Sequence, residues 1–284
     1  MEKSAASRTA LVTSLMRAAH TRLDPHPLIE DSWGDRLVPE SAKRAMASSN
    51  EMLDELLMRS PSYANVITRT RYAEDALQAA VSRGVRQYVL IGAGFDSFAL
   101  RRPQFGANLQ IFEIDFPATQ NLKTAQIEAR GIALPEGVYF IAADLSQESV
   151  AAALARTPFE TQQLTFFSWL GVTMYLTREA NLATFRSIAS CSPTASEVVF
   201  TYLDERVFQA RSEAFRELEQ RVAAVGEPFL SGFGSGELAA ALADCGLKLV
   251  EDLNGDEAAA RYDRGGDLRW GRSLFSHIAL ARVI

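Results

Sequence analysis

The chain has 284 residues, of which 48% are hydrophobic and 23% charged, a balance that is ordinary for a globular protein with a sizeable core. This composition excludes the disordered and fibrous classes. The formal net charge of −6 and the pI of about 5.3 disfavour a general nucleic-acid partner, because contacts with phosphates require a basic surface.

The first 85 residues have the apolar spacing of helices. Leu11, Leu15 and Met16 fall on one apolar face, and a second apolar face runs through residues 42–58. Residues 62–83 form a third candidate helix that ends at a glycine. We therefore expect an N-terminal helical cap, residues 1–85, ahead of a core formed by residues 86–284 in one compact domain.

From residue 87 onward, short apolar runs alternate with helical stretches. Strands are predicted at residues 88–92, 109–115, 138–142, 164–169 and 198–203, and helices at residues 118–130, 147–156 and 178–189. Most of the runs are apolar on both faces, which is typical of parallel strands covered by helices on each side. The alternation predicts an α/β fold with a doubly wound sheet.

The last third of the chain completes this pattern. A charged helical segment at residues 205–225 is followed by a glycine-rich loop, a short helix and two more apolar runs, at residues 247–253 and 277–284. No obvious crossover helix joins these two runs, so we expect an antiparallel pair at one edge. The result is a mostly parallel, seven-stranded sheet.

The segment IGAGFDS, residues 91–97, follows the first predicted strand. Gly92 and Gly94, on either side of Ala93, permit a tight turn and the close approach of a ligand. A nicotinamide or flavin site needs a third glycine at the position of Ser97, where the pyrophosphate meets a helix. Asp96 is also unwelcome beside a phosphate but is compatible with S-adenosylmethionine, which carries a sulfonium and an ammonium group.

Acidic residues end the next two predicted strands. Asp115 lies roughly 20 residues beyond the glycine loop, the spacing of a ribose-binding acid, and Glu113 points the same way along the strand. Either carboxylate could accept hydrogen bonds from the two ribose hydroxyls, or it could instead face solvent. Asp144 could accept from an adenine amine while the Leu145 N–H donates to the ring, or Asp144 could cap the next helix.

Several stretches together resemble the leucine carboxyl methyltransferase family and its bacterial relatives, which are class I S-adenosylmethionine-dependent methyltransferases. They are RTRYAED (69–75), RQYVLIGAGFDSFALR (86–101), FEIDFP (112–117), AADL (142–145), LGVTMYLT (170–177) and GEPFLSGFGSGEL (226–238). The likeness spans nearly the whole chain. It implies the class I fold and S-adenosylmethionine as the cofactor.

The resemblance also implies roles for particular residues. Arg69 would hold the methionine carboxylate, Gly92 would contact the cofactor, Asp115 would bind the ribose, and Asp144 with Leu145 would bind the adenine. Arg71 is a second candidate for the carboxylate, with a surface ion pair to Glu74 or Asp75 as the alternative. One departure from the family is Leu170, which stands where relatives often have an acid.

The acceptor side of the site is less constrained by the sequence. Tyr202 ends the fifth predicted strand and Tyr175 follows the fourth, so both are candidate catalytic residues near the transferred methyl group. Each could equally be structural. Phe229 and Phe233 could line an apolar acceptor pocket beneath the loop at residues 226–236.

Methyl transfer from a sulfonium requires the donor and the nucleophile to be held in line. We therefore predict an S-adenosylmethionine-dependent O-methyltransferase that acts on a carboxylate or hydroxyl of a small molecule, for example in secondary metabolism. The alternatives are methylation of a protein C-terminal carboxylate, a NAD-dependent oxidoreductase, and a non-catalytic S-adenosylmethionine-binding protein.

The remaining predictions concern metal, membrane and location. The two cysteines and three histidines are scattered, so no metal site is predicted and the cysteines are expected to be buried thiols. No run approaches the ~18 apolar residues of a membrane span. No signal peptide is apparent, and a cytoplasmic protein without a membrane partner is expected.

Overall fold

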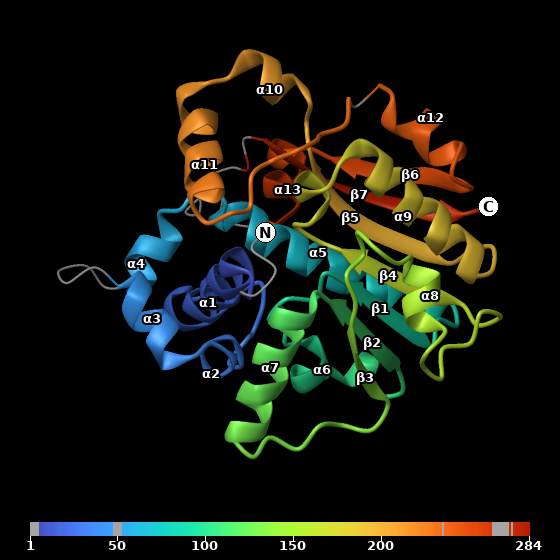
Figure 1. Cartoon of the computed structure of the whole chain (residues 1–284), viewed down its shortest axis with the longest axis horizontal. Helices are drawn as coiled ribbons and strands as arrows, with labels where there is room; N and C mark the ends of the chain where they lie inside the picture. Colours follow the sequence, from blue (N-terminus) through green and yellow to red (C-terminus); the bar gives the residue numbers. More distant parts are fainter. Residues whose placement is uncertain (1–5, 48–52, 235, 263–272, 274) are drawn as a thin grey trace.

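The computed structural model describes residues 6–47, 53–234, 236–262, 273 and 275–284 (Figure 1). The helices are α1 (Arg8–Leu23), α2 (Gly34–Leu37), α3 (Glu40–Met46), α4 (Leu53–Met58), α5 (Tyr63–Ser82), α6 (Phe98–Arg101), α7 (Pro117–Ala129), α8 (Val150–Leu154), α9 (Arg178–Cys191), α10 (Arg206–Ala210), α11 (Glu213–Ala224), α12 (Leu238–Ala243) and α13 (Gly255–Tyr262). Two 3-10 turns, η1 (Gln104–Gly106) and η2 (Thr173–Tyr175), complete the helical elements of the described residues.

A twisted sheet forms the centre of the molecule. Its strands are β1 (Gln87–Ile91), β2 (Gln110–Asp115), β3 (Val138–Ala142), β4 (Thr165–Trp169), β5 (Glu197–Leu203), β6 (Leu247–Leu253) and β7 (Ser276–Val283). They lie in the order β3-β2-β1-β4-β5-β7-β6. The strands from β1 to β5 pair in parallel, while β7 runs antiparallel to both β5 and β6. The predicted doubly wound, mostly parallel seven-stranded fold is confirmed.

Helices cover both faces of the sheet, as the apolar strands require. Side chains of α8, α9 and α12 share one core with inward-facing residues of the strands, and α5, α6 and α13 share a second core on the other face. The short helix α13 lies between β6 and β7, where no crossover helix was expected. The two cysteines are buried and not bridged.

The N-terminal helices form a separate apolar cluster beside the sheet (Figure 1). Leu11, Leu15 and Met16 of α1 are buried there, as the sequence predicted, together with Phe95 from the glycine loop. The cap is therefore packed directly onto the segment that follows β1. None of the described helices is both long and apolar enough to cross a membrane.

Two segments that were each predicted as one helix are each divided into two helices. The segment at residues 42–58 contains α3 and α4, because Ala47 is extended and ends α3; residues 48–52 lie outside the described residues. The segment at residues 205–225 contains α10 and α11. Arg211 adopts a φ of +43° that ends α10, and Ser212 starts α11 by accepting from the Phe215 N–H at 3.3 Å.

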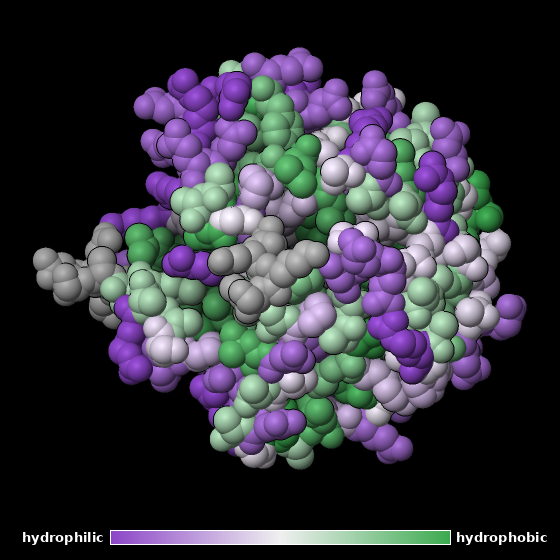
Figure 2. Space-filling model, in the orientation of Figure 1, coloured by the Kyte–Doolittle hydropathy of each residue, from purple (hydrophilic) through white to green (hydrophobic). Residues whose placement is uncertain are grey.

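The two helices α10 and α11 stand over the carboxyl-terminal edge of the sheet. Phe215 and Val222 form the buried side of α11, and its remaining residues are exposed or half-buried. Figure 2 shows hydrophilic atoms gathered at this corner of the molecule, with apolar atoms beside them toward the middle of the face.

Candidate functional site

The glycine loop lies at the edge of the sheet where the parallel strands end, which is where open α/β sheets bind ligands. Gly92 and Gly94 have φ values of +66° and +54°, a region that favours glycine. The N–H groups of Gly92 and Ala93 donate to the Ile114 carbonyl at 2.9 and 3.1 Å, which ties the loop to β2. A Cβ atom on Gly92 would lie 2.5 Å from Val172 Cγ2, so a larger residue would not fit.

Asp115 closes this loop from the end of β2. Its carboxylate accepts from the Gly94 N–H and, at 2.6 Å, from the Phe116 N–H. Burial raises the pKa of Asp115 to about 6, although these two N–H groups favour the ionised form. The structure therefore places the predicted ribose-binding acid directly beside the glycine loop.

Glu113 and Asp96 have other partners. The Glu113 carboxylate is fully buried and forms an ion pair with Lys123 of α7, and burial raises its pKa to about 7. Lys123 Nζ also donates to the Asp96 carbonyl at 2.6 Å. The Asp96 side chain accepts from the Phe98 N–H at 2.7 Å and so shapes the turn that leads into α6. Glu113 thus contacts the glycine loop indirectly, through Lys123. Asp115 is the remaining candidate for binding the ribose.

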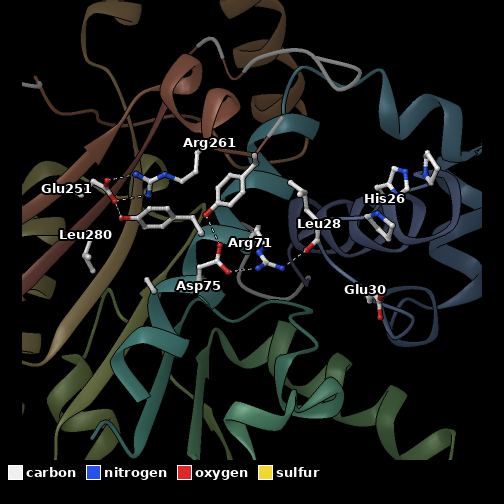
Figure 3. Close-up of a pocket in the computed structure, with 13 residues that line it drawn as sticks. His26, Leu28, Glu30, Arg71, Asp75, Glu251, Arg261 and Leu280 are labelled. Carbon is white, nitrogen blue, oxygen red and sulfur yellow. Dashed lines mark hydrogen bonds and ion pairs between the residues drawn. The ribbon is translucent and has the colours of Figure 1, made fainter. Parts of the chain in front are cut away.

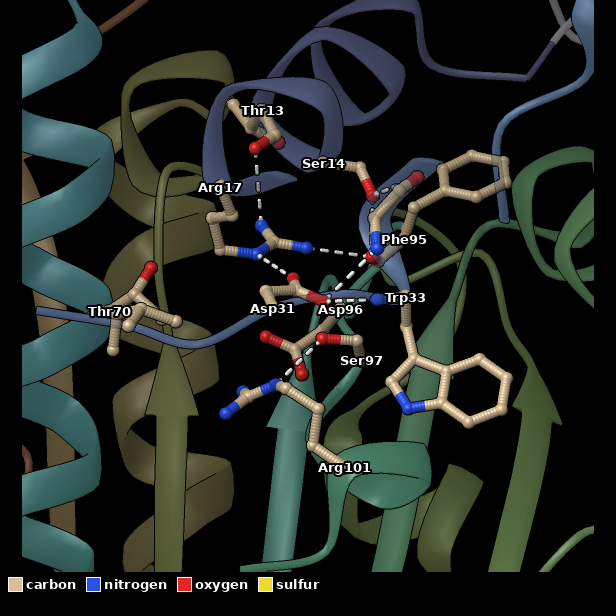
Figure 4. Close-up of polar contacts among 12 residues, drawn as sticks. Thr13, Ser14, Arg17, Asp31, Trp33, Thr70, Phe95, Asp96, Ser97 and Arg101 are labelled. Carbon is tan, nitrogen blue, oxygen red and sulfur yellow. Dashed lines mark hydrogen bonds and ion pairs between the residues drawn. The ribbon is translucent and has the colours of Figure 1, made fainter. Parts of the chain in front are cut away.

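The cap helix α1 holds the far side of the loop (Figure 4). Arg17 Nη2 donates to the Phe95 carbonyl at 2.7 Å, and Ser14 Oγ donates to the same carbonyl at 3.1 Å. Arg17 Nε is in turn paired at 2.9 Å with Asp31, whose side chain is 0% exposed. The other Asp31 oxygen accepts from the N–H groups of Trp33 and Gly34. This buried network was not predicted from the sequence, because its members are spread over 80 residues.

Arg69, on α5, lies against the turn that follows β4. A Cβ atom on Gly171 would be 2.6 Å from both terminal guanidinium nitrogens of Arg69. Arg69 Nη1 donates to Asn65 Oδ1 at 3.1 Å, and within the described chain Arg69 forms no ion pair with an acid. Burial lowers the pKa of Arg69 to about 10, whereas nearby Tyr175 acts in the opposite direction.

Arg71 has its partners outside the glycine loop. It forms an ion pair with Asp75 at 2.7 Å and donates to the Leu28 carbonyl at 3.2 Å (Figure 3). Here it lines a separate cavity of about 840 Å³ together with Tyr72 and Arg261. The structure thus gives Arg71 the ion pair that was the alternative to a cofactor role.

The two candidate catalytic tyrosines lie in different surroundings. Tyr175 lies near Arg69, stacks on Phe229 with ring centroids 5.7 Å apart, and has a pKa raised to about 12 by burial and by Glu227. Tyr202 is fully buried, and its hydroxyl donates to Asp252 at 2.7 Å and lies 3.1 Å from His277 Nδ1. Only Tyr175 is brought close to the other site residues.

The turn after β3 carries the predicted adenine contacts. Asp144 Oδ1 accepts from the N–H and the hydroxyl of Ser146, at 3.0 and 2.6 Å, while Leu145 packs against the main core. The structure therefore shows Asp144 shaping a turn, and its role toward adenine stays a prediction.

The family of the chain can now be stated. A model of the leucine carboxyl methyltransferase family matches residues 10–189, more than half of the chain. The chain belongs to this family. Membership confirms the predicted methyltransferase class and S-adenosylmethionine as the cofactor, and it removes the oxidoreductase alternative.

Relatives of this leucine carboxyl methyltransferase family member are found in bacteria. A Bacillus subtilis (strain 168) protein described as "Putative S-adenosyl-L-methionine-dependent methyltransferase YktD" is 31% identical over 280 residues, covering 90% of this chain and 91% of the relative. A Mycolicibacterium smegmatis protein with a similar description is 29% identical over 204 residues, covering 70% of this chain and 67% of the relative.

Solved structures share the fold at low sequence identity. A DUF574 family protein from Streptomyces avermitilis MA-4680 superposes with a TM-score of 0.63 at 14% identity, covering 100% of this chain and 99% of the other. A Thermobifida fusca YX protein described as a "putative methyltransferase" gives a TM-score of 0.62 at 13% identity, covering 95% and 94%. These likenesses confirm the architecture.

Proposed function

We propose that this methyltransferase transfers a methyl group to a carboxylate or hydroxyl oxygen of a small, largely aromatic molecule. An aromatic cluster beside Arg69 carries the proposal. Tyr175 stacks on Phe229, which lies 6.0 Å from Phe215 in a further stacked contact, and Phe208 and Phe275 meet Phe215 edge-on. Aromatic rings pack well on such a surface.

The residues present fit the cofactor. The glycine loop allows close backbone approach, Asp115 offers carboxylate oxygens to the ribose hydroxyls, and Arg69 offers a guanidinium without an acidic partner to the methionine carboxylate. Asp144 and Leu145 would contact the adenine. When bound, the cofactor supplies a methyl group on a positively charged sulfur. The protein has to align the acceptor with that group and exclude water, which fits a mechanism based on positioning.

Charges around the aromatic cluster favour a small molecule over a protein C-terminus. A buried C-terminal carboxylate would need free cationic side chains, but three arginines of this region are paired and Arg69 is assigned to the cofactor. Arg206 binds Asp204, Arg178 binds Glu237 at 3.1 Å, and Arg211 binds Glu219 at 2.9 Å. Of the two phenylalanines predicted to line the pocket, Phe229 lies in this cluster, whereas Phe233 is buried in the main core.

The proposal is tested by measuring S-adenosylhomocysteine formation with aromatic acids, phenols, aliphatic acids and C-terminal peptides as acceptors. We expect turnover with aromatic acceptors. Alkali releases methanol from a methyl ester but not from a methyl ether, so it identifies the oxygen that was methylated. Turnover with peptides alone would support the protein alternative. Tight cofactor binding without any turnover would support the non-catalytic alternative.

Phe229→Ala should raise the KM for an aromatic acceptor about two- to tenfold, because the variant loses a stacking contact worth about 0.5–1.5 kcal/mol. Its affinity for S-adenosylhomocysteine should not change. Phe105→Ala, an aromatic truncation beside Phe98 on another part of the protein, is the control and should leave both constants unchanged. An unchanged KM in Phe229→Ala would contradict the placement of the acceptor.

The ribose contact of Asp115 predicts a pH dependence of binding. Its pKa is raised to about 6, so the carboxylate becomes protonated as the pH falls through that value. It then no longer accepts hydrogen bonds from both ribose hydroxyls. The affinity for 5′-methylthioadenosine, which has the ribose but no amino-acid part, should be constant above about pH 7 and fall up to about tenfold per pH unit below about pH 6. Calorimetric titrations between pH 5 and 8 measure this directly. Asp115→Asn should bind weakly with a flat profile, and a flat wild-type profile would exclude the contact.

A further inference from the structure

Most acids near the glycine loop are already satisfied by protein groups. Asp115 accepts hydrogen bonds from two backbone N–H groups, Glu113 is paired with Lys123, and Asp96 accepts from the Phe98 N–H. Glu227, in the loop after α11, is different. It is 7% exposed, and neither carboxylate oxygen has a hydrogen-bond partner among the described residues.

The surroundings of Glu227 place it inside the site. The Ser7 hydroxyl and the N–H groups of Arg8 and Thr9, in the first turn of α1, are close enough to favour its ionised form. None of them is positioned to donate a hydrogen bond of normal geometry. The same turn of α1 covers the glycine loop, since a Cβ atom on Gly94 would lie 3.0 Å from Ala10 Cβ.

Glu227 is also near the residues assigned to the cofactor. Its charge raises the pKa of both Asp115 and Tyr175, while the Arg69 guanidinium acts on Tyr175 in the opposite direction. Glu227 and Arg69 are therefore both near Tyr175, whose ring stacks on Phe229, two residues along the chain from Glu227. They form no ion pair with each other within the described residues, and neither has another charged partner there.

An unpartnered carboxylate and an unpartnered guanidinium are costly to bury, so a ligand that carries both complementary charges would satisfy the two together. The amino-acid part of S-adenosylmethionine carries one ammonium and one carboxylate group. Among the described acids of the glycine-loop region, Asp96, Glu113 and Asp115 already have protein partners, and Leu170 stands where relatives often have an acid. Glu227 is the buried carboxylate that remains.

We propose that Glu227 binds the ammonium group of the cofactor's methionine moiety, opposite Arg69 on the carboxylate. This inference rests on the proposed function and adds a residue to it. It also connects the cofactor to the loop that carries Phe229.

The test compares two ligands by calorimetry, S-adenosylhomocysteine and 5′-methylthioadenosine, which lacks the amino-acid part. Glu227→Gln should weaken S-adenosylhomocysteine about ten- to hundredfold, the effect of losing one charge-assisted hydrogen bond. It should leave 5′-methylthioadenosine unchanged. Glu237→Gln is the matched control, because Glu237 lies in the same part of the chain with a side chain that is 66% exposed. It should change neither affinity.

Other outcomes would overturn the inference. Equal weakening of both ligands, with a lower melting temperature of the free protein, would make Glu227 only a clamp for the first turn of α1. Unchanged binding with lost turnover would make it a group that acts on the acceptor. If the wild-type protein bound neither ligand, the proposed function itself would fail. Wild-type binding that depends on Arg69 but not on Glu227 would overturn this inference alone.

Discussion

Replacing Arg17 with methionine should lower the free energy of unfolding by about 3–5 kcal/mol, the cost of leaving a buried acid without its partner. Asp31 is completely buried and would lose its only cationic hydrogen-bond donor among the described residues. The Phe95 carbonyl would also lose a donor at 2.7 Å. Urea unfolding followed by circular dichroism gives the free energy, and we expect an unchanged slope with a lower midpoint.

The same substitution should weaken cofactor binding, because Phe95 lies inside the glycine loop. S-adenosylhomocysteine affinity is measured at a temperature where the variant is fully folded. In the double variant Arg17→Met, Asp31→Leu no buried charge is left over, so part of the stability should return, although the N–H groups of Trp33 and Gly34 lose their acceptor. The affinity should not return, because the loop still lacks its donor. A stability loss below about 1 kcal/mol in Arg17→Met would contradict the network.

Replacing Arg69 with methionine should have opposite effects on binding and on stability. The affinity for S-adenosylhomocysteine should fall about hundredfold, since the methionine carboxylate loses a charge-assisted contact. The melting temperature of the free protein should stay the same or rise. The pKa of Arg69 is lowered by burial, so keeping its charged form in the folded protein costs stability that methionine removes.

Arg71→Met provides the matched control, with the same change two residues further along the same helix. Arg71 forms a partly exposed pair with Asp75, and such pairs contribute about 0–1 kcal/mol. We expect little change in stability and none in S-adenosylhomocysteine affinity. If Arg71→Met reduced the affinity and Arg69→Met did not, the assignment of the carboxylate contact would be reversed.

The strands could be predicted to within a residue because each is a short apolar run, apolar on both faces in most of the parallel strands, bounded by turn or helical segments. Helix continuity was harder to predict. The break at Arg211 depends on one backbone conformation and on the Ser212 cap, and apolar spacing does not report either. Likewise α8 starts at Val150 rather than at residue 147, because Ser149 caps it by accepting from the Ala152 N–H at 3.2 Å.

Residues at strand ends could be predicted as candidates, but their partners could not. Alternation along β2 places Glu113 and Asp115 on one face, yet Lys123 from the next helix binds only Glu113. Tyr202 was placed near the methyl group from its strand position alone. Its hydroxyl contacts Asp252 and His277, which are 50 and 75 residues away. Such contacts follow from the pairing of β5 with β7, which no local pattern encodes.

The position of α1 has a practical consequence for attaching tags or surface linkers. The Ser7 N–H donates to the Thr119 hydroxyl at 3.0 Å, and the turn that follows lies over Gly94, so Ser7 itself lies beside the cofactor site. Ile284 is 64% exposed and follows β7, whose end pairs with the start of β5 at the opposite edge of the sheet. Affinity tags, fluorophores and immobilisation chemistry therefore belong at the C-terminus, where they leave ligand entry free.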